Sequence, residues 1–217
     1  NYTRDAAAAE AVAADVRTAG RRALVVQADV ADEAQVLAMF NAVDRGLGVL
    51  RGLVNNAGVV DLPQRVDQMS VARLKRMFDI NVIGSMVCAR EAVRRMSTRH
   101  GGAGGSIVNL SSAAAKIGSP GQYVDYAAAK GAIDTFTLGL AREVATEGVR
   151  VNGVRPGIIE TDIHASGGLP DRAREMAPMV PMRRAGSAQE VATAIVWLLS
   201  DEASYATGTV IDVTGGR

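Results

Sequence analysis

Short apolar segments alternate with longer amphipathic segments along the chain. Five short segments are rich in β-branched residues and end in turn-forming residues, as is typical of buried parallel strands: 23–29, 50–58, 105–112, 149–157 and 207–216. Five longer ones have helical periodicity: 5–19, 32–46, about 67–99, about 122–147 and 187–200. Strands that alternate with helices predict an α/β fold, in which helices cover both faces of a parallel sheet.

The predicted helices carry capping residues at several of their ends. N-capping side chains precede three of them, and glycines that can end a helix follow three. The N-caps are Asp5, Asp32 and Ser187, and the glycines are Gly20, Gly101 and Gly148.

The composition narrows the class of protein. The 217 residues are 48% hydrophobic, which is enough for one buried domain over 1–217. The 24 basic and 23 acidic residues nearly balance, so we expect no nucleic-acid partner. No apolar run reaches the ~18–20 residues that cross a bilayer, so we expect no membrane partner. Cys88 is the only cysteine, which favours a reducing compartment such as the cytoplasm.

Polar residues follow three of the predicted strands. They are NNAG at 55–58, NLSS at 109–112 and RPGIIET at 155–161. These residue types also form ordinary turns and caps, so each segment alone is ambiguous. Because ligands of open parallel sheets bind beyond the carboxyl ends of the strands, we expect the active site in these loops.

A tyrosine and a lysine lie four residues apart in YAAAK at 126–130. Such residues share one helix face, although an alanine-rich helix also contains such pairs by accident. An ammonium ~4 Å away at an effective dielectric of ~20 contributes about 4 kcal/mol, or about three pKa units. We therefore expect Lys130 to lower the pKa of Tyr126 toward neutrality if the pair is buried. Tyr123 has no lysine at this spacing and is interpreted as a pocket-wall or loop aromatic.

Six motifs, read together, resemble the short-chain dehydrogenase/reductase family over essentially the whole chain. They are DV at 29–30, NNAG at 55–58, NV at 81–82, NLSS at 109–112, YAAAK at 126–130 and RPG at 155–157. YVDYAAAKGAID and HASGG are especially similar to the glucose-1-dehydrogenase-like and ketoacyl-reductase-like branches. The resemblance implies a Rossmann-type, doubly wound, three-layer fold. It also implies hydride transfer between a nicotinamide coenzyme and a carbonyl or alcohol.

The resemblance implies four catalytic residues and no metal ion. Tyr126 would be the general acid/base, Lys130 would also bind the nicotinamide ribose, and Ser112 would position the substrate oxygen. Asn81 would hold a water that links Lys130 to solvent. Ser112 lies fourteen residues before Tyr126, whereas the family often has thirteen, so Ser111 is the fallback.

The resemblance also implies a set of coenzyme contacts. These are Arg4, Asp29, Val30, Asn55, Ala57, Gly58, Tyr126, Lys130, Pro156, Gly157 and Thr161. An acidic residue after the second strand of the family favours NAD. Here the corresponding NYTR offers Arg4, which could pair a 2′-phosphate, so NADP is favoured and NAD stays possible.

The Gly-rich phosphate turn of the family is not found before residue 50. We therefore expect that most of the first β-α-β unit precedes Asn1, in roughly 25–35 further residues. Without it, the flanking strands would have unpaired edges and dinucleotide affinity would be weak.

The Gly-, Pro- and Met-rich segment 162–186 is interpreted, by analogy, as a mobile lid over the substrate. His164 is expected near that pocket without a catalytic role. The long helices with apolar residues on several faces favour a homotetramer. The alternative to an enzyme is a catalytically silent dinucleotide-binding sensor or scaffold. The sequence does not name the substrate.

Overall fold

Four parallel strands form the central sheet of the computed structural model, which describes residues 1–217. They run in the order β1-β2-β3-β6, with each strand hydrogen-bonded to the next. Four of the five predicted strands are confirmed, each a little shorter than expected. Their bounds are β1 (Gly52–Asn55), β2 (Gly105–Leu110), β3 (Val149–Pro156) and β6 (Val210–Val213).

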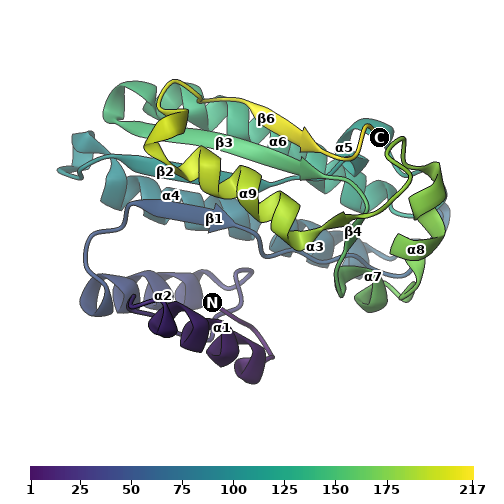
Figure 1. Cartoon of the computed structure of the whole chain (residues 1–217), viewed down its shortest axis with the longest axis horizontal. Helices are drawn as coiled ribbons and strands as arrows, with labels where there is room; N and C mark the ends of the chain where they lie inside the picture. Colours follow the sequence, from purple (N-terminus) through teal and green to yellow (C-terminus); the bar gives the residue numbers. More distant parts are fainter.

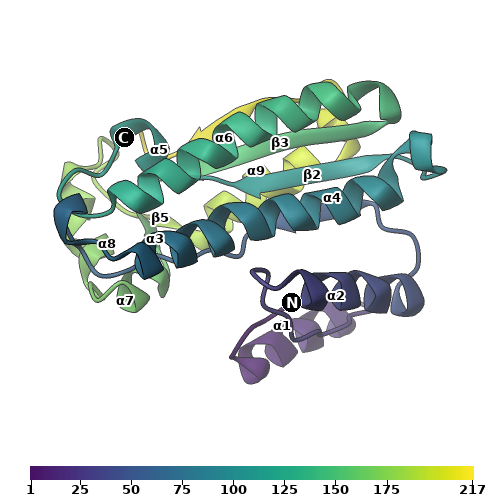
Figure 2. The same cartoon turned by 180° about the vertical axis from the view of Figure 1, so that it is seen from behind.

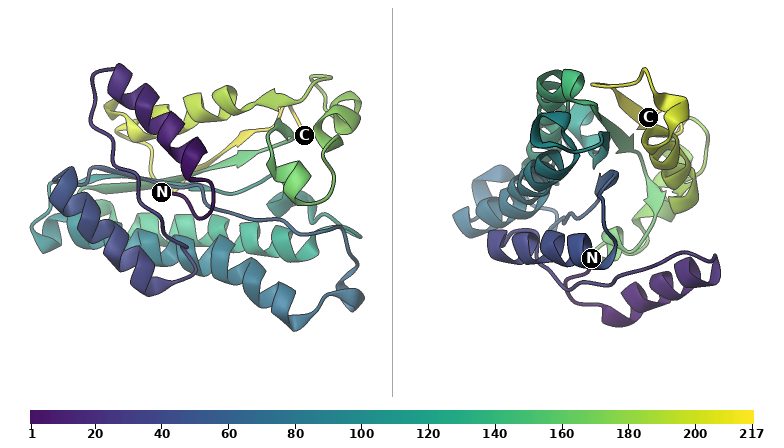
Figure 3. Two further views of the ribbon diagram at one scale, coloured as in Figure 1. Left: turned by 90° about the horizontal axis from the view of Figure 1, so that it is seen from below. Right: turned by 90° about the vertical axis from the view of Figure 1, so that its left-hand side faces the viewer.

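Helices cover both faces of this sheet, which confirms the doubly wound α/β class. Helices α4 (Gly84–Met96) and α6 (Val124–Val144) lie on one face (Figure 2). Helix α9 (Ala188–Leu199) lies on the other (Figure 1). The end-on view separates the three layers, with α1 (Ala6–Thr18) and α2 (Glu33–Gly46) beyond β1 (Figure 3, right).

Side chains from alternate positions of the strands fill two cores. Ile107 and Val151 point to the face of α4, where Met96 is fully buried. Val108 and Val154 point to the opposite face, against Leu198 of α9. None of the helices is both long and apolar enough to span a lipid bilayer.

The predicted helix ends agree with the observed caps. The side chains of Asp5, Asp32 and Ser187 accept hydrogen bonds from the first turns of α1, α2 and α9. Ser187 and Glu190 bond each other's backbone in a capping box. Of the glycines, Gly148 follows the 3₁₀ turn η4 (Ala145–Glu147) with a φ of 74°.

The single helix expected at about 67–99 is wrong. The segment divides into η1 (Val66–Gln68), α3 (Val71–Phe78), the π-helix η2 (Asp79–Ile83), α4 and η3 (Thr98–His100). Ser70 accepts from the backbone of Arg73 and so starts a new helix at Val71. The π-helix surrounds Asn81, whose buried amide bonds to neighbouring carbonyls, and the apolar periodicity does not mark this insertion.

The strand expected at 23–29 is also wrong. This stretch forms one isolated parallel bridge, between Gln27 and Tyr2, and joins no sheet. Its extended backbone has no other strand beside it, and a ladder requires a partner. A groove of about 320 Å³ lies between Tyr2 and β1, and Val30 and Cys88 also line it.

The segment after β3 folds over the carboxyl end of the sheet (Figure 1). It contains two short parallel strands that the apolar pattern does not predict, β4 (Ile159–Glu160) and β5 (Gly186–Ser187). Between them lie α7 (Ile163–Ser166), α8 (Arg172–Met176) and η5 (Ala177–Met179). The remaining short elements are α5 (Ala114–Ile117) and η6 (Asp201–Ala203).

Candidate active site

A cavity of about 710 Å³ opens at the carboxyl ends of β1, β2 and β3, where the sequence predicts the active site. Its walls come from the loops after these strands, from the start of α6 and from the segment that contains α7 and α8. Its volume lies within the usual range of small-molecule sites. About half of the lining residues are hydrophobic, with polar groups gathered near Ser112, Tyr126 and Lys130.

Ser112 and Tyr126 face each other in this cavity. Ser112 lies just past the end of β2, and its hydroxyl accepts a hydrogen bond from the backbone of Ala114 at 3.2 Å. Tyr126 lies in the first turn of α6 and lines the same cavity, close enough to Ser112 for that side chain to lower the pKa of the phenol. Burial, which raises this pKa, is the larger effect, so the phenol lies away from bulk solvent.

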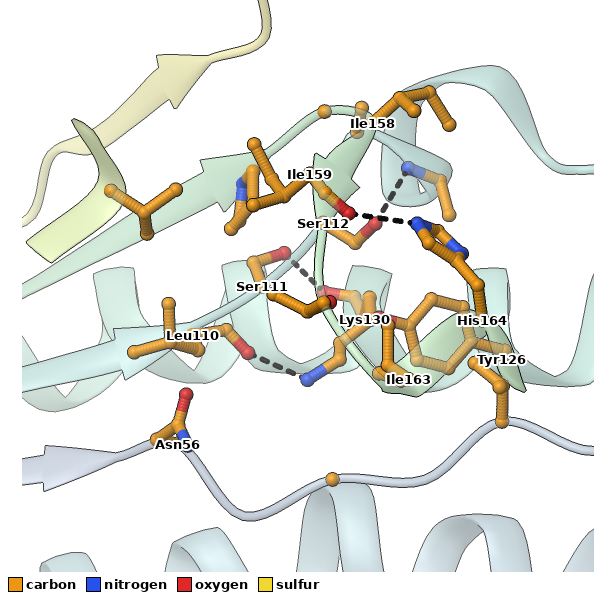
Figure 4. Close-up of a pocket in the computed structure, with 18 of the residues that line it drawn as sticks. Asn56, Leu110, Ser111, Ser112, Tyr126, Lys130, Ile158, Ile159, Ile163 and His164 are labelled. Atoms are coloured by element: carbon orange, nitrogen blue, oxygen red, sulfur yellow. Dashed lines mark hydrogen bonds between the residues drawn. The ribbon is translucent and has the colours of Figure 1, made fainter. Parts of the chain in front are cut away.

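Lys130 lies one turn further along α6 and is 4% exposed. Its ammonium donates to the carbonyl of Leu110 at 2.7 Å and lies 5.6 Å from the centre of the Tyr126 ring (Figure 4). Burial lowers the pKa of Lys130 to about 8, against the raising effect of Asp134. The lysine therefore stays mostly charged at neutral pH although it is buried.

The expected lowering of the Tyr126 pKa is not found in this structure. Burial raises the pKa of Tyr126, and the interaction with the Ser112 side chain only partly opposes that effect. The ammonium is bonded to the carbonyl of Leu110. Desolvation of the phenolate is therefore the dominant effect.

The geometry separates the two candidate serines. Ser111 is buried, and its hydroxyl donates to the backbone carbonyl of Lys130 at 3.1 Å. That bond ties the end of β2 to α6 and directs Ser111 away from the phenol (Figure 4). Ser112 is the serine beside Tyr126, in spite of the extra residue in the spacing.

Asn81 is fully buried in the π-helix and close to Lys130. Its amide donates to the carbonyls of Val59 and Met77, and its oxygen accepts from the backbone of Val59. A β-carbon on Gly58 would lie 2.8 Å from the Asn81 oxygen and 3.5 Å from the Lys130 nitrogen. The glycine therefore allows the β1 loop to pass close to both side chains.

The structure brings seven of the eleven predicted coenzyme contacts to this cavity. They are Ala57, Gly58, Tyr126, Lys130, Pro156, Gly157 and Thr161. Backbone groups next to small residues, a threonine hydroxyl, an ammonium and apolar walls suit a nicotinamide and its ribose. This part of the site therefore fits the half of the coenzyme that reacts.

The other four predicted contacts lie elsewhere. Val30 and Asn55 line the groove beside Tyr2, whereas Asp29 and Arg4 line neither cavity. Asn55 points inward and donates to Asn109 at 2.9 Å, so its side chain holds β1 to β2. This side chain is therefore engaged within the fold, and a coenzyme contact at Asn55 stays a prediction.

A buried ion pair positions the start of α6, and the sequence analysis missed it. Arg73 of α3 donates to both carboxylate oxygens of Asp125, at 2.8 and 3.3 Å. Asp125 also accepts from the backbone N–H of Tyr126 at 2.9 Å. The hydrogen bond between Arg73 and Asp125 raises the pKa of Arg73. In the sequence, the only signal for this ion pair is the position of Asp125 directly before Tyr126.

Two arginines in the cavity wall were also missed. Arg172 of α8 and Arg217 both line it, as does His164. The His164 ring bonds to the carbonyl of Ile159 at 2.9 Å, and burial lowers its pKa. These residues lie in irregular segments, where no regular spacing in the sequence predicts which side chains face the cavity.

The chain is similar to known proteins over its whole length. A sequence profile described as "Enoyl-(Acyl carrier protein) reductase" matches residues 1–217. The "Uncharacterized oxidoreductase YgfF" of Escherichia coli is 53% identical over 217 residues, which are 100% of this chain and 88% of that protein. A crystal structure of a short-chain type dehydrogenase/reductase from Mycobacterium marinum superposes with a TM-score of 0.90 at 32% identity. That match covers 98% of this chain and 82% of the other.

Relatives from both expected branches are similar over the full chain. "Glucose 1-dehydrogenase 2" of Bacillus subtilis is 32% identical and "3-oxoacyl-[acyl-carrier-protein] reductase FabG" of Staphylococcus aureus is 36% identical; this chain covers 83% and 85% of them. The chain belongs to the short-chain dehydrogenase/reductase family. It is an NAD(P)-dependent oxidoreductase that acts on a carbonyl or CH-OH group.

The burial of Lys130 predicts a stability that depends on pH. Its pKa is about 8 in the folded chain and about 10.4 when unfolded. Between these values the unfolded chain binds more protons, so unfolding free energy rises with pH, by about 3 kcal/mol in total. Lys130→Met lacks this rise. Urea titrations at pH 7, 8.5 and 10 should therefore show a stability advantage of the variant that shrinks as pH increases.

The matched control is Lys116→Met, which removes an exposed lysine and reports the general effect of losing one positive charge. An advantage of Lys130→Met that stays constant from pH 7 to pH 10 would contradict the buried ammonium.

Proposed function

We propose that this protein transfers a hydride between NADP(H) and a carbonyl or alcohol substrate, with Tyr126 as general acid/base. The observation that carries the proposal is that Ser112, Tyr126 and the buried Lys130 line one cavity, with Lys130 held by the carbonyl of Leu110. These are the groups that carbonyl reduction needs. A protonated phenol, a second hydroxyl and a nearby positive charge converge on one place.

In the reduction direction, negative charge develops on the substrate oxygen. The bound coenzyme supplies the hydride. Tyr126 donates its proton to that oxygen, and Ser112 hydrogen-bonds the same oxygen. Charged Lys130 stabilises the phenolate that remains. Below about pH 8 the lysine keeps its proton, so both groups are in the form that this direction requires.

The supporting residues hold this pair in place. Leu110 fixes the ammonium through its carbonyl, and Asp125 fixes the first turn of α6 through the backbone of Tyr126. Asn81 lies close to the Gly58 backbone beside Lys130, where it would hold the water that links the lysine to solvent. Segment 162–186 would act as the lid that closes the cavity over the substrate.

The alternative of a silent sensor or scaffold is less consistent with these contacts. Such a protein needs the coenzyme cavity but has no use for a buried ammonium, which is costly to bury. Lys130 is retained with a lowered pKa, as is common for groups with a chemical task.

The first test compares Tyr126→Phe with Tyr123→Phe in the full-length protein. Loss of the Tyr126 hydroxyl should lower kcat by about 10²–10⁴-fold, the usual contribution of a positioned acid. Tyr123 is buried in the same cavity wall without a lysine one turn later, so its variant is the matched control and should keep its kcat. Initial rates with NADPH and a panel of carbonyl compounds give the readout. Equal turnover of Tyr126→Phe and wild type would eliminate the proposed acid.

The preference for NADP rests on Arg4, which makes no ion pair. Its segment is joined to residues 27 and 28 by hydrogen bonds of Asn1 and Thr3, so it runs beside the stretch that leads into the predicted adenine contacts Asp29 and Val30. Arg4→Gln should weaken NADPH binding by about tenfold, because a charge-assisted hydrogen bond to the 2′-phosphate is lost, and leave NADH binding unchanged. Fluorescence titration with both coenzymes measures this. Arg21→Gln is the control; an equal loss for both coenzymes would contradict the assignment.

A homotetramer is proposed from large apolar side chains that are exposed on the helices. They are Ile83 of η2, Met86 of α4, Leu138 of α6, and Val196 and Trp197 of α9. Exposed large apolar side chains that cluster on helix faces often mark subunit contacts. Light scattering of the full-length protein should give about four times the mass of one chain. A mass equal to that of one chain would contradict this assembly.

A reducing compartment such as the cytoplasm, which the single cysteine Cys88 suggests, stays a prediction.

A further inference from the structure

Two guanidinium groups line the cavity on the side of Tyr123. Arg172 of α8 donates to the side chain of Gln122 at 2.9 Å and lies 5.2 Å from the centre of the Tyr123 ring. These contacts hold the arginine against the start of α6, three residues before Tyr126. Arg217 lines the same cavity after β6. Both side chains belong to half-buried residues.

Neither of these arginines has a carboxylate within 4.0 Å, unlike most arginines of the chain around the cavity. Arg174 on the same short helix pairs with Asp171, and Arg184 pairs with Glu190. A guanidinium carries five donors, and Arg172 uses one of them on Gln122. Most of its hydrogen-bonding capacity is therefore free for a ligand.

The charges around the cavity are unbalanced. Its charged lining residues are the cations Lys130, Arg172 and Arg217 and a single carboxylate, on the exposed Asp162. Burial lowers the pKa of Arg217, and the charge of Arg172 lowers it further, so the two guanidiniums are close enough to repel each other. A half-buried pair of like charges is unfavourable unless an anion offsets it.

We propose that the substrate carries an anionic group, a carboxylate or a phosphate, in addition to its carbonyl or alcohol. This inference rests on the proposed function and names the class of substrate for the same site. Arg172 and Arg217 bind the anion, and the reacting carbon lies on the other side of Tyr123, beside Tyr126 and Ser112. Planar guanidiniums suit this task because their forked donors match carboxylate and phosphate oxygens.

The experiment compares anionic carbonyl compounds with neutral partners of the same skeleton. The probes are oxo acids with two to five carbons between the groups, each with its methyl ester, and dihydroxyacetone phosphate with dihydroxyacetone. The full-length wild type should turn over at least one anion with a kcat/KM about tenfold or more above its neutral partner. The carboxylate and phosphate series distinguish the two kinds of anion.

The variants assign that preference to the arginines. Arg172→Gln and Arg217→Gln should each lower the anion-to-neutral ratio by about tenfold through the KM of the anion, with the KM for the coenzyme unchanged. Arg172→Lys should restore part of the ratio. Arg174→Gln, on the same helix but paired with Asp171 outside the cavity, is the matched control and should leave it unchanged.

The inference is overturned if every neutral partner is used as well as its anion, or if the two Gln variants keep the wild-type ratio. It is also overturned if those variants raise the coenzyme KM instead, because the arginines would then serve the coenzyme. If the wild type reduces no carbonyl at all, the proposed function fails separately. Calorimetry of the oxo acids and dihydroxyacetone phosphate with coenzyme present then decides: binding that Arg172→Gln weakens supports the anion site, and binding that it leaves unchanged overturns it.

Discussion

The site depends on one buried contact, between the ammonium of Lys130 and the backbone carbonyl of Leu110. A charged lysine in a nearly dry place is costly, and its pKa falls to about 8 as a result. The contact exists because Ser111, at the end of β2, bonds the backbone of α6 beside the same lysine. The carboxyl end of β2 is therefore hydrogen-bonded both to the backbone of α6 and to the ammonium of Lys130.

Much of the fold follows from the sequence because strands and caps have local causes. Asp5, Asp32 and Ser187 cap the helices that their positions predict, and four of the predicted strands form the parallel sheet. The failures have long-range causes. Residues 23–29 have strand-like composition but only Tyr2 beside them, and no local pattern reveals how many partners a strand has.

The sequence predicted several residues that line the candidate site, but it did not predict the direction in which the pKa of Tyr126 shifts. The motif residues Ser112, Tyr126 and Lys130 converge as their positions in the family imply. The pKa of Tyr126 does not follow, because it depends on burial and on where the ammonium points, and neither is encoded in an i, i+4 spacing. For the same reason the sequence does not predict the pairing of Arg73 with Asp125, which joins residues 52 positions apart.

We propose that a charged Lys130 makes the phenol of Tyr126 a stronger acid when the coenzyme closes the site. Titration of ¹³C-labelled tyrosine by NMR, in the full-length protein with NADP bound, measures that acidity directly. We expect the pKa of Tyr126 to be lower in the wild type than in Lys130→Met, because the ammonium stabilises the phenolate. The same pKa in both proteins would contradict it.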